Sequence, residues 1–347
     1  EAPLSSGASA LSMLLVTLGE ALHAFNGYAC AEAVRALSLL PARQRGTAFV
    51  LNLLARCHFE MANYTKAVDT WEACLDKHQC CRALSLDMYS TALWHLRDAA
   101  KLGALAQRAL DWDRQSPQTW CVVGNSFALQ GDHGQAINYF SRAAKLGPSR
   151  AYPRTLLAHE YVASDRFDKA IQAYQEAIAI DHRHYKAWWG LGNVYLLQED
   201  HKNARYHFEI ALGINSRNHV VRTSLGMVHQ ALRQPELALE LFASVEEDPQ
   251  CRPLALFQKG SVLTAAGRES EAIEVLQRAI ALAPQEACIH FQLGKALVGL
   301  GDRGRALLHF TRSIDLSGVK GSEDHQVVAA VQSELARAVP AAAGVRT

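Results

Sequence analysis

The spacing of small and large apolar residues repeats with a period of 34 residues over most of the chain. An alanine marks each period from residue 136 onward, and a large apolar residue follows four positions later. A small residue stands twelve positions before each of these alanines, which are Ala136, Ala170, Ala204, Ala238, Ala272 and Ala306. A pattern of this length predicts a repeated pair of helices rather than one closed core.

The residue types at these positions indicate how the helices of a pair pack. A small residue lets an antiparallel helix approach closely, and a large one fills the space between neighbouring pairs. The small residues are Gly124, Ala158, Gly192, Gly226, Gly260 and Gly294, and the large ones are Phe140, Tyr174, Phe208, Phe242, Leu276 and Phe310. This arrangement is the tetratricopeptide repeat, and the six matches in phase predict an all-α superhelical solenoid.

The same pattern continues more weakly toward the N-terminus. Ala33 and Ala67 lie 34 residues apart, and Leu102 lies 35 beyond Ala67, which indicates one inserted residue near Cys81 or Arg82. We therefore expect about nine repeats, beginning near Leu14, Ala48, Ala83, Pro117, Ala151, Tyr185, His219, Pro253 and Ala287.

The repeat positions predict four segments of the chain. Residues 1–13 are expected to be flexible, 14–116 to hold three divergent repeats and 117–320 to hold six regular ones. Residues 321–347 are expected to form a capping helix, from Ser322 to Val339, and a loose tail. A polar outer face on such a helix would close the end of the stack.

Composition narrows the function classes. Hydrophobic residues make up 49% of the chain and the net charge is +1, which argues against disorder and against a nucleic-acid partner. The apolar stretch from Leu11 to Phe25 is too short to span a bilayer and contains Glu20 and His23, so we expect an amphipathic helix and no membrane partner. The chain begins at Glu1, and we expect it to be an intracellular, soluble fragment of a longer protein.

Neither a cofactor, a metal site nor catalysis is expected. The eight cysteines include no C-x-x-C pair and predict buried free thiols. Neither His182 with His184 nor His201 with His207 has the carboxylate or thiol neighbours of a ligand set. No phosphate-binding loop or nucleophile motif is present in the sequence, so the chain is not expected to be an enzyme.

The first helix of each repeat should line a groove with positions 2, 5, 9 and 12. The central repeats place aromatic rings, amides and one carboxylate on or beside these positions, which suits an arginine and an adjacent apolar side chain of an extended peptide. From the residues alone we favour the other interpretation, that these are ordinary solvated groove residues, because every such repeat protein has some groove composition. The candidates are Asn125, Tyr152, His159, Glu160, Trp189 and Asn193.

Three segments go beyond the general repeat pattern: residues 89–96 (YSTALWHL), 116–127 (SPQTWC through GNSF) and 184–192 (HYKAWWGLG). They resemble the C-terminal repeats of the Cdc27-type subunit of the anaphase-promoting complex. A sister subunit, the Cdc23 type, shares part of these segments. The resemblance runs from about Leu14 to Leu316.

The resemblance implies a scaffold in mitotic ubiquitin ligation, in the nucleus and cytoplasm, whose partners are other repeat subunits of that complex. It also implies that the groove binds the C-terminal Ile-Arg tail of a co-activator. In this family an Asn and a Glu on successive first helices receive the arginine, and the matching positions are Asn125 and Glu160. The isoleucine is assigned to Tyr152, Trp189 and Asn193. The family forms homodimers through a further N-terminal repeat block that lies outside this sequence.

A general adaptor or co-chaperone that binds another protein's tail is the competing hypothesis. Clamping an acidic C-terminus needs clustered Lys and Arg residues in the groove. The groove positions offer Lys186 and Lys295 without such a cluster. A glycosyltransferase would need a catalytic domain, for which this chain leaves no room.

Overall fold

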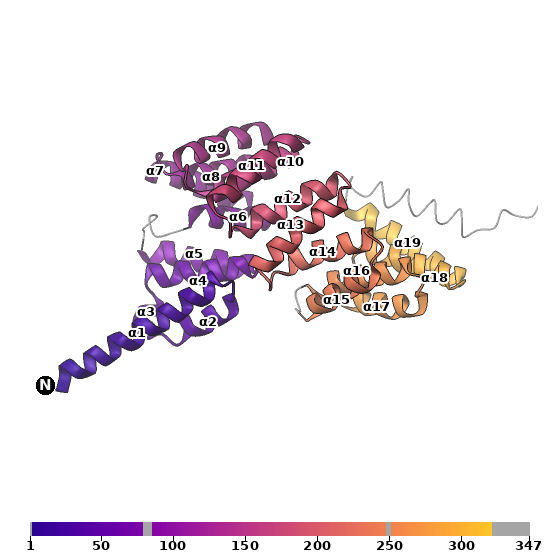
Figure 1. Cartoon of the computed structure of the whole chain (residues 1–347), viewed down its shortest axis with the longest axis horizontal. Coiled ribbons are helices and arrows are strands. Elements are labelled where there is room, and N and C mark those ends of the chain that lie inside the picture. Colours follow the sequence, from indigo (N-terminus) through magenta and orange to yellow (C-terminus); the bar gives the residue numbers. More distant parts are fainter. Residues whose placement is uncertain (1, 79–84, 248–250, 321–347) are drawn as a thin grey trace, which may run out of the picture. The chain divides into compact units, whose positions relative to one another are not determined.

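The computed structural model describes residues 2–78, 85–247 and 251–320, and every regular element in these ranges is a helix (Figure 1). The helices form nine consecutive antiparallel pairs, with one additional short helix, α3 (Ala42–Arg45). The pairs are α1 (Ala2–Asn26) with α2 (Cys30–Ser38), α4 (Ala48–Glu60) with α5 (Tyr64–His78), α6 (Leu86–His95) with α7 (Ala99–Trp112), α8 (Pro117–Leu129) with α9 (His133–Leu146), α10 (Ala151–Ala163) with α11 (Phe167–Ile180), α12 (Tyr185–Leu197) with α13 (His201–Ile214), α14 (His219–Ala231) with α15 (Pro235–Glu246), α16 (Arg252–Ala265) with α17 (Glu269–Leu282), and α18 (Ala287–Gly299) with α19 (Arg303–Lys320).

The all-α repeat architecture is thus confirmed, and most repeats begin within one residue of the predicted positions. Two features differ from the sequence prediction. Helix α1 begins at Ala2, before Leu14, where the sequence pattern places the start of the first repeat. Helix α3 was not predicted because four residues are too short for a periodic signal. The capping helix and the inserted residue fall outside the described residues.

Close packing between the two helices of a repeat explains the small residue in each period. A Cβ added to Gly124 of α8 would lie 2.5 Å from the ring of Phe140 of α9, and one added to Gly226 would lie 2.7 Å from that of Phe242. Both rings are fully buried. A methyl group cannot occupy that space, which explains the glycine at these two positions.

Aspartates begin several of the second helices. Asp98, Asp132 and Asp200 each accept a backbone N–H from the residue three positions later, at 2.9, 3.0 and 3.1 Å respectively. These are N-cap bonds, which satisfy one of the free donors at a helix start. The turn before α9 passes through Gly131 with φ +80°, a conformation that favours glycine. Capping and turn chemistry therefore fix the boundaries of the helices.

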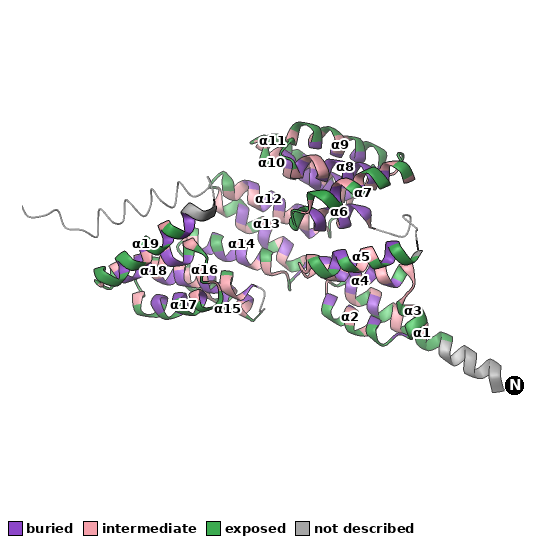
Figure 2. Cartoon of the chain, turned by 180° about the vertical axis from the view of Figure 1, so that it is seen from behind, coloured by how far each residue is buried: buried purple, intermediate pink, exposed green. Residues whose placement is uncertain are grey.

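The helix pairs group into two compact units, residues 1–218 (unit 1) and 219–347 (unit 2). In the first unit the second helices present an exposed outer side while the first helices are more covered, as α9 and α8 show (Figure 2). In the described part of the chain no helix has the length and apolar character needed to cross a bilayer.

Candidate functional site

The candidate ligand-binding residues lie on the first helices of three consecutive repeats of unit 1, α8, α10 and α12. Among the described residues there is no group of three or more metal-ligating side chains. Six described cysteines are free, and five of them are buried. The chemistry of this region therefore comes from amide, hydroxyl, aromatic and charged side chains.

Asn125 is buried, with 4% of its surface exposed, on α8. Its Nδ2 donates to Ser90 Oγ at 2.8 Å and to Thr91 Oγ1 at 3.1 Å, both on α6. The two amide hydrogens are thus used, and no described side chain donates to its carbonyl oxygen. Asn125 is held in one orientation with an acceptor left over.

Tyr152 of α10 joins the same hydrogen-bond network. Its hydroxyl donates to Thr91 Oγ1 at 2.9 Å, and burial raises the pKa of Tyr152 well above its usual value, so the phenol stays neutral. Its ring lies 6.2 Å from that of His184, edge to face. Asn125 and Tyr152 therefore meet at Thr91, a residue that the repeat positions did not single out.

Glu160 has a different set of neighbours. Its Oε2 accepts from His133 Nδ1, at the start of α9, at 2.8 Å, and only 8% of the residue is exposed. Burial raises the pKa of Glu160, and the His133 contact opposes that rise in part. In the described part of the chain no hydrogen bond joins Glu160 to Asn125. The two residues assigned to the arginine thus belong to separate networks.

His159 and Trp189 form a third group. Tyr174 Oη and His159 Nδ1 are hydrogen bonded at 2.8 Å, and the rings of His159 and Trp189 lie 6.2 Å apart. Burial, with smaller contributions from nearby cationic groups, lowers the pKa of His159 to about 4, so the imidazole is neutral at physiological pH. Asn193 is half-buried on α12 and makes no side-chain hydrogen bond to another described residue. Nothing in these contacts connects Asn193 to the other candidates.

The contact that the sequence did not reveal joins the second repeat to the sixth. Lys186 Nζ of α12 lies 2.8 Å from Glu60 Oε1 of α4, and Tyr185 Oη donates to Glu60 Oε2 at 2.8 Å. The Lys186 ammonium also lies 4.3 Å from the centre of the Phe59 ring and 5.8 Å from that of Tyr152. No pattern with a 34-residue period signals a contact between residues 126 positions apart.

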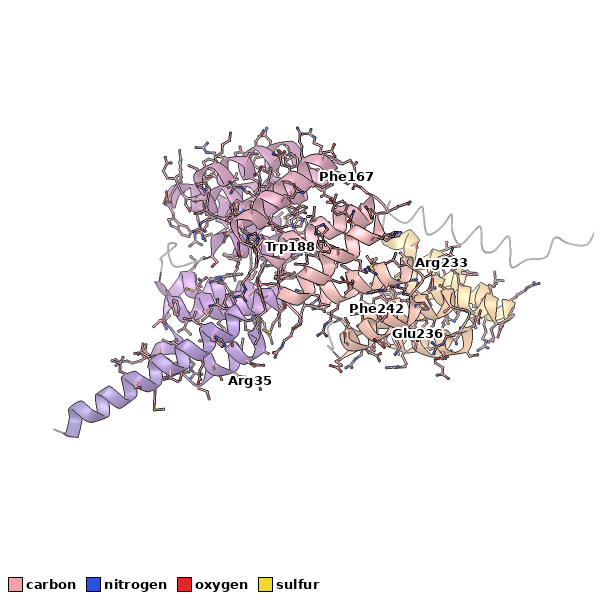
Figure 3. The ribbon with its side chains drawn as sticks, viewed as in Figure 1. Arg35, Phe167, Trp188, Arg233, Glu236 and Phe242 are labelled. Atoms are coloured by element: carbon pink, nitrogen blue, oxygen red, sulfur yellow. The ribbon has the colours of Figure 1, made fainter. Side chains whose placement is uncertain are left out.

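Trp188, next to the candidate Trp189, has a structural role (Figure 3). Its Nε1 donates to the carbonyl oxygen of His182 at 3.0 Å, and its ring stacks on that of His207 with centroids 5.7 Å apart. These contacts tie the start of α12 to α13. Trp188 therefore packs within its own repeat.

Comparison with known proteins extends these observations. A family model described as "Tetratricopeptide repeat" matches residues 155–219, and one described as "TPR repeat" matches residues 260–301. A crystal structure described as the APC/C hetero-tetramer Cut9-Hcn1 matches 89% of this chain and 59% of its own, with a TM-score of 0.69 at 16% identity. That likeness concerns the fold alone.

Two curated relatives match most of the chain. Anaphase-promoting complex subunit 3 of Schizosaccharomyces pombe is 34% identical over 308 residues, which are 89% of this chain and 46% of that protein. Cell division cycle protein 27 homolog B of Arabidopsis thaliana is 36% identical over 314 residues, 90% of this chain and 42% of that protein. The chain thus spans less than half the length of these relatives. On sequence, repeat pattern and fold together, it belongs to the Cdc27 family of tetratricopeptide-repeat proteins.

Proposed function

We propose that this chain is a non-catalytic scaffold subunit of an anaphase-promoting complex and that its unit 1 groove binds the C-terminal Ile-Arg tail of a co-activator. Its relatives include a protein named as a subunit of that complex. Other repeat subunits would be its further partners, and a homodimer would form through sequence beyond this chain. The proposal places the protein in the nucleus and cytoplasm.

The observation that carries the tail-binding proposal is the fixed amide of Asn125. Ser90 and Thr91 accept both amide hydrogens, so the carbonyl oxygen is the group that Asn125 can offer to a ligand. A guanidinium has five N–H donors and no acceptor, which makes it a suitable partner for a preoriented carbonyl. Because the amide is already ordered, binding loses little side-chain entropy.

Glu160 supplies the charge complement in this proposal. Its carboxylate is buried and is hydrogen bonded to the imidazole of His133, whose side chain is 41% exposed. Removing a carboxylate from water is costly unless a cation compensates it, as the raised pKa of Glu160 reflects. A guanidinium near its second oxygen would provide that compensation. The separate networks of Asn125 and Glu160 mean that each must be tested alone.

Trp189 and Tyr152 offer apolar surface for the isoleucine. Both are half-buried on α12 and α10, and the ring of Trp189 stands beside that of His159. An aromatic surface next to a neutral imidazole suits an aliphatic side chain. The competing adaptor hypothesis needs clustered groove cations, whereas the described neighbours of Lys186 are the Glu60 carboxylate and aromatic rings.

The experiment measures binding of a fluorescent peptide that ends in Ile-Arg to the wild-type chain, Asn125→Ala and Glu160→Ala. The control peptide lacks the last two residues. We expect each variant to lose about 1.5–3 kcal/mol of binding free energy, which is roughly tenfold or more in affinity. Equal affinity for both peptides in the wild-type chain would refute tail recognition. If only one of the two variants loses affinity, the arginine of the peptide binds at the residue replaced in that variant.

A further inference from the structure

One lysine ammonium of unit 1 lies near three aromatic rings. Lys186 Nζ lies 4.3 Å from the centre of the Phe59 ring, 5.7 Å from that of Tyr185 and 5.8 Å from that of Tyr152. Its one described hydrogen bond goes to Glu60 Oε1, which leaves two of its three N–H groups for other acceptors. The side chain keeps 21% of its surface exposed, whereas that of Glu60 keeps 6%.

Contacts between distant repeats fix the position of this ammonium. Tyr185 donates to the other oxygen of Glu60, and Asn218 Nδ2 donates to Tyr185 Oη at 3.2 Å. Tyr28 donates from its hydroxyl to the carbonyl oxygen of Arg183 at 3.2 Å, and Arg183 donates to the carbonyl oxygen of Asn26 at 2.9 Å. The first two repeats thus contact the residues around the start of α12, the helix that carries Lys186.

Lys186 is continuous with the proposed tail site. Its ammonium contacts the Tyr152 ring, the Tyr152 hydroxyl meets Thr91, and Thr91 meets Asn125. The neighbouring imidazoles carry no compensating positive charge at physiological pH, because burial lowers the pKa of His159 and of His184 to about 4. Among Lys186, His159 and His184, the positive charge is therefore that of Lys186.

We infer that Lys186 is the receptor for the free α-carboxylate of the bound tail, and that it restricts the groove to polypeptide C-termini. The inference rests on the proposed tail binding and deepens it. A C-terminal arginine carries its carboxylate and its guanidinium on one residue, so a single ligand residue offers an anion to Lys186 and N–H donors to the Asn125 carbonyl oxygen. Two free ammonium hydrogens and a partly desolvated setting favour a charge-assisted bond.

A substitution of Glu60 distinguishes carboxylate binding by Lys186 from a purely structural role of the Lys186–Glu60 pair. The Glu60 carboxylate holds the ammonium but also opposes an approaching anion. Replacing it by glutamine keeps an accepting oxygen for Lys186, places an amide N–H donor opposite the Tyr185 oxygen, and removes the opposing charge. Preference for a carboxylate should therefore rise in Glu60→Gln and vanish in Lys186→Met. If the pair only held the repeats together, both changes would weaken every peptide alike.

The experiment compares two Ile-Arg peptides, one ending in a free acid and one in a neutral amide, on each form of the chain. The measured quantity is the ratio of the two affinities, so any general loss of groove structure cancels within a variant. We expect a preference for the acid of roughly tenfold or more in the wild-type chain, retained in Lys186→Arg. Lys202→Met, at an exposed position on α13, is the matched control and should leave the ratio unchanged.

The outcomes separate the two proposals. Equal binding of acid and amide, with binding still dependent on Ile-Arg, overturns the carboxylate assignment and leaves the proposed function standing. A ratio that persists in Lys186→Met overturns the assignment as well. If Lys186→Met binds neither peptide, the Glu60→Gln variant decides. An acid-to-amide affinity ratio above the wild-type ratio supports the inference, and a ratio equal to or below it overturns the inference. Absence of binding of either peptide to the wild-type chain overturns both proposals.

Discussion

Units 1 and 2 use the same packing inside each repeat but differ in how their side chains connect distant repeats. In both, a glycine on the first helix faces a large ring on the second, as Gly124 with Phe140 and Gly226 with Phe242 show. In unit 1, Glu60 reaches Tyr185 and Lys186, which are 125 and 126 residues away. In unit 2, Glu246 pairs with Lys259 and Arg278, at separations of 13 and 32 residues.

The difference separates the requirements of the fold from those of binding. Contacts between neighbouring repeats are enough to hold a solenoid together, since its stability is close to a sum of local terms. The long-range polar contacts of unit 1 have a further consequence, because they bring polar, charged and aromatic side chains of α4, α6, α10 and α12 close together around Tyr152 and Lys186. We therefore expect both units to share their packing energetics and only unit 1 to recognise the tail.

The largest expected effect tests the shared packing. Phe140→Ala in unit 1 and Phe242→Ala in unit 2 each remove a fully buried ring and should lower the free energy of unfolding of the surrounding repeats by about 3–5 kcal/mol. Native-state amide hydrogen exchange measures this repeat by repeat. Leu308→Ala, at a position that is 69% exposed, is the control and should change stability by less than about 0.5 kcal/mol. A large cost in one unit alone would show that the packing is not equivalent.

The next effect tests the ion pairs of the two units. Lys186→Met leaves the Glu60 carboxylate buried with Tyr185 as its remaining partner, and should cost about 3 kcal/mol of unfolding free energy. Lys259→Met leaves Glu246 paired with Arg278, so its cost should stay near about 1 kcal/mol. Urea unfolding of both variants measures which of them loses more unfolding free energy. Equal costs would mean that the long-range contacts of unit 1 contribute no more than local ones.

A third prediction confines peptide recognition to unit 1. Met227 and Ser261 occupy, in the seventh and eighth repeats, the ninth position that Asn125 occupies in the fourth. Met227→Ala and Ser261→Ala should leave the affinity for an Ile-Arg peptide unchanged, whereas Asn125→Ala should weaken binding by about 1.5–3 kcal/mol. Titration of one labelled peptide against the three variants measures this. Weaker binding to Met227→Ala would extend the site into unit 2.

The smallest expected effect is a pH dependence of unit 1. Burial lowers the pKa of His159 and His184 to about 4, below the usual value of 6.5, so the folded state binds fewer protons than the unfolded state between these limits. The stability of unit 1 should therefore be highest above pH 6.5 and fall as the pH drops toward 4. Urea unfolding at a series of pH values measures the slope. His184→Gln removes one titrating group and should flatten it, and an unchanged slope would contradict the assignment.

The sequence by itself determined the repeat architecture. The 34-residue spacing of alanines, glycines and large apolar residues was sufficient because each repeat packs on its neighbours, so the necessary information is local. It also placed Asn125, Tyr152, His159 and Trp189 on first helices of adjacent repeats, where the structure has them. The pattern did not predict the short helix α3, because four residues are too few to show a period.

The tertiary structure alone decided which of those residues meet. Thr91 joins Asn125 to Tyr152 through hydrogen bonds. Glu160, the residue after the half-buried His159, is instead hydrogen bonded to His133. A helix turns by about 100° per residue, so adjacent positions have different neighbours, and repeat numbering cannot say which neighbour is near. The Glu60–Lys186 contact depends on how the repeats curve. That curvature is the sum of small rotations between repeats, which the periodic pattern does not encode.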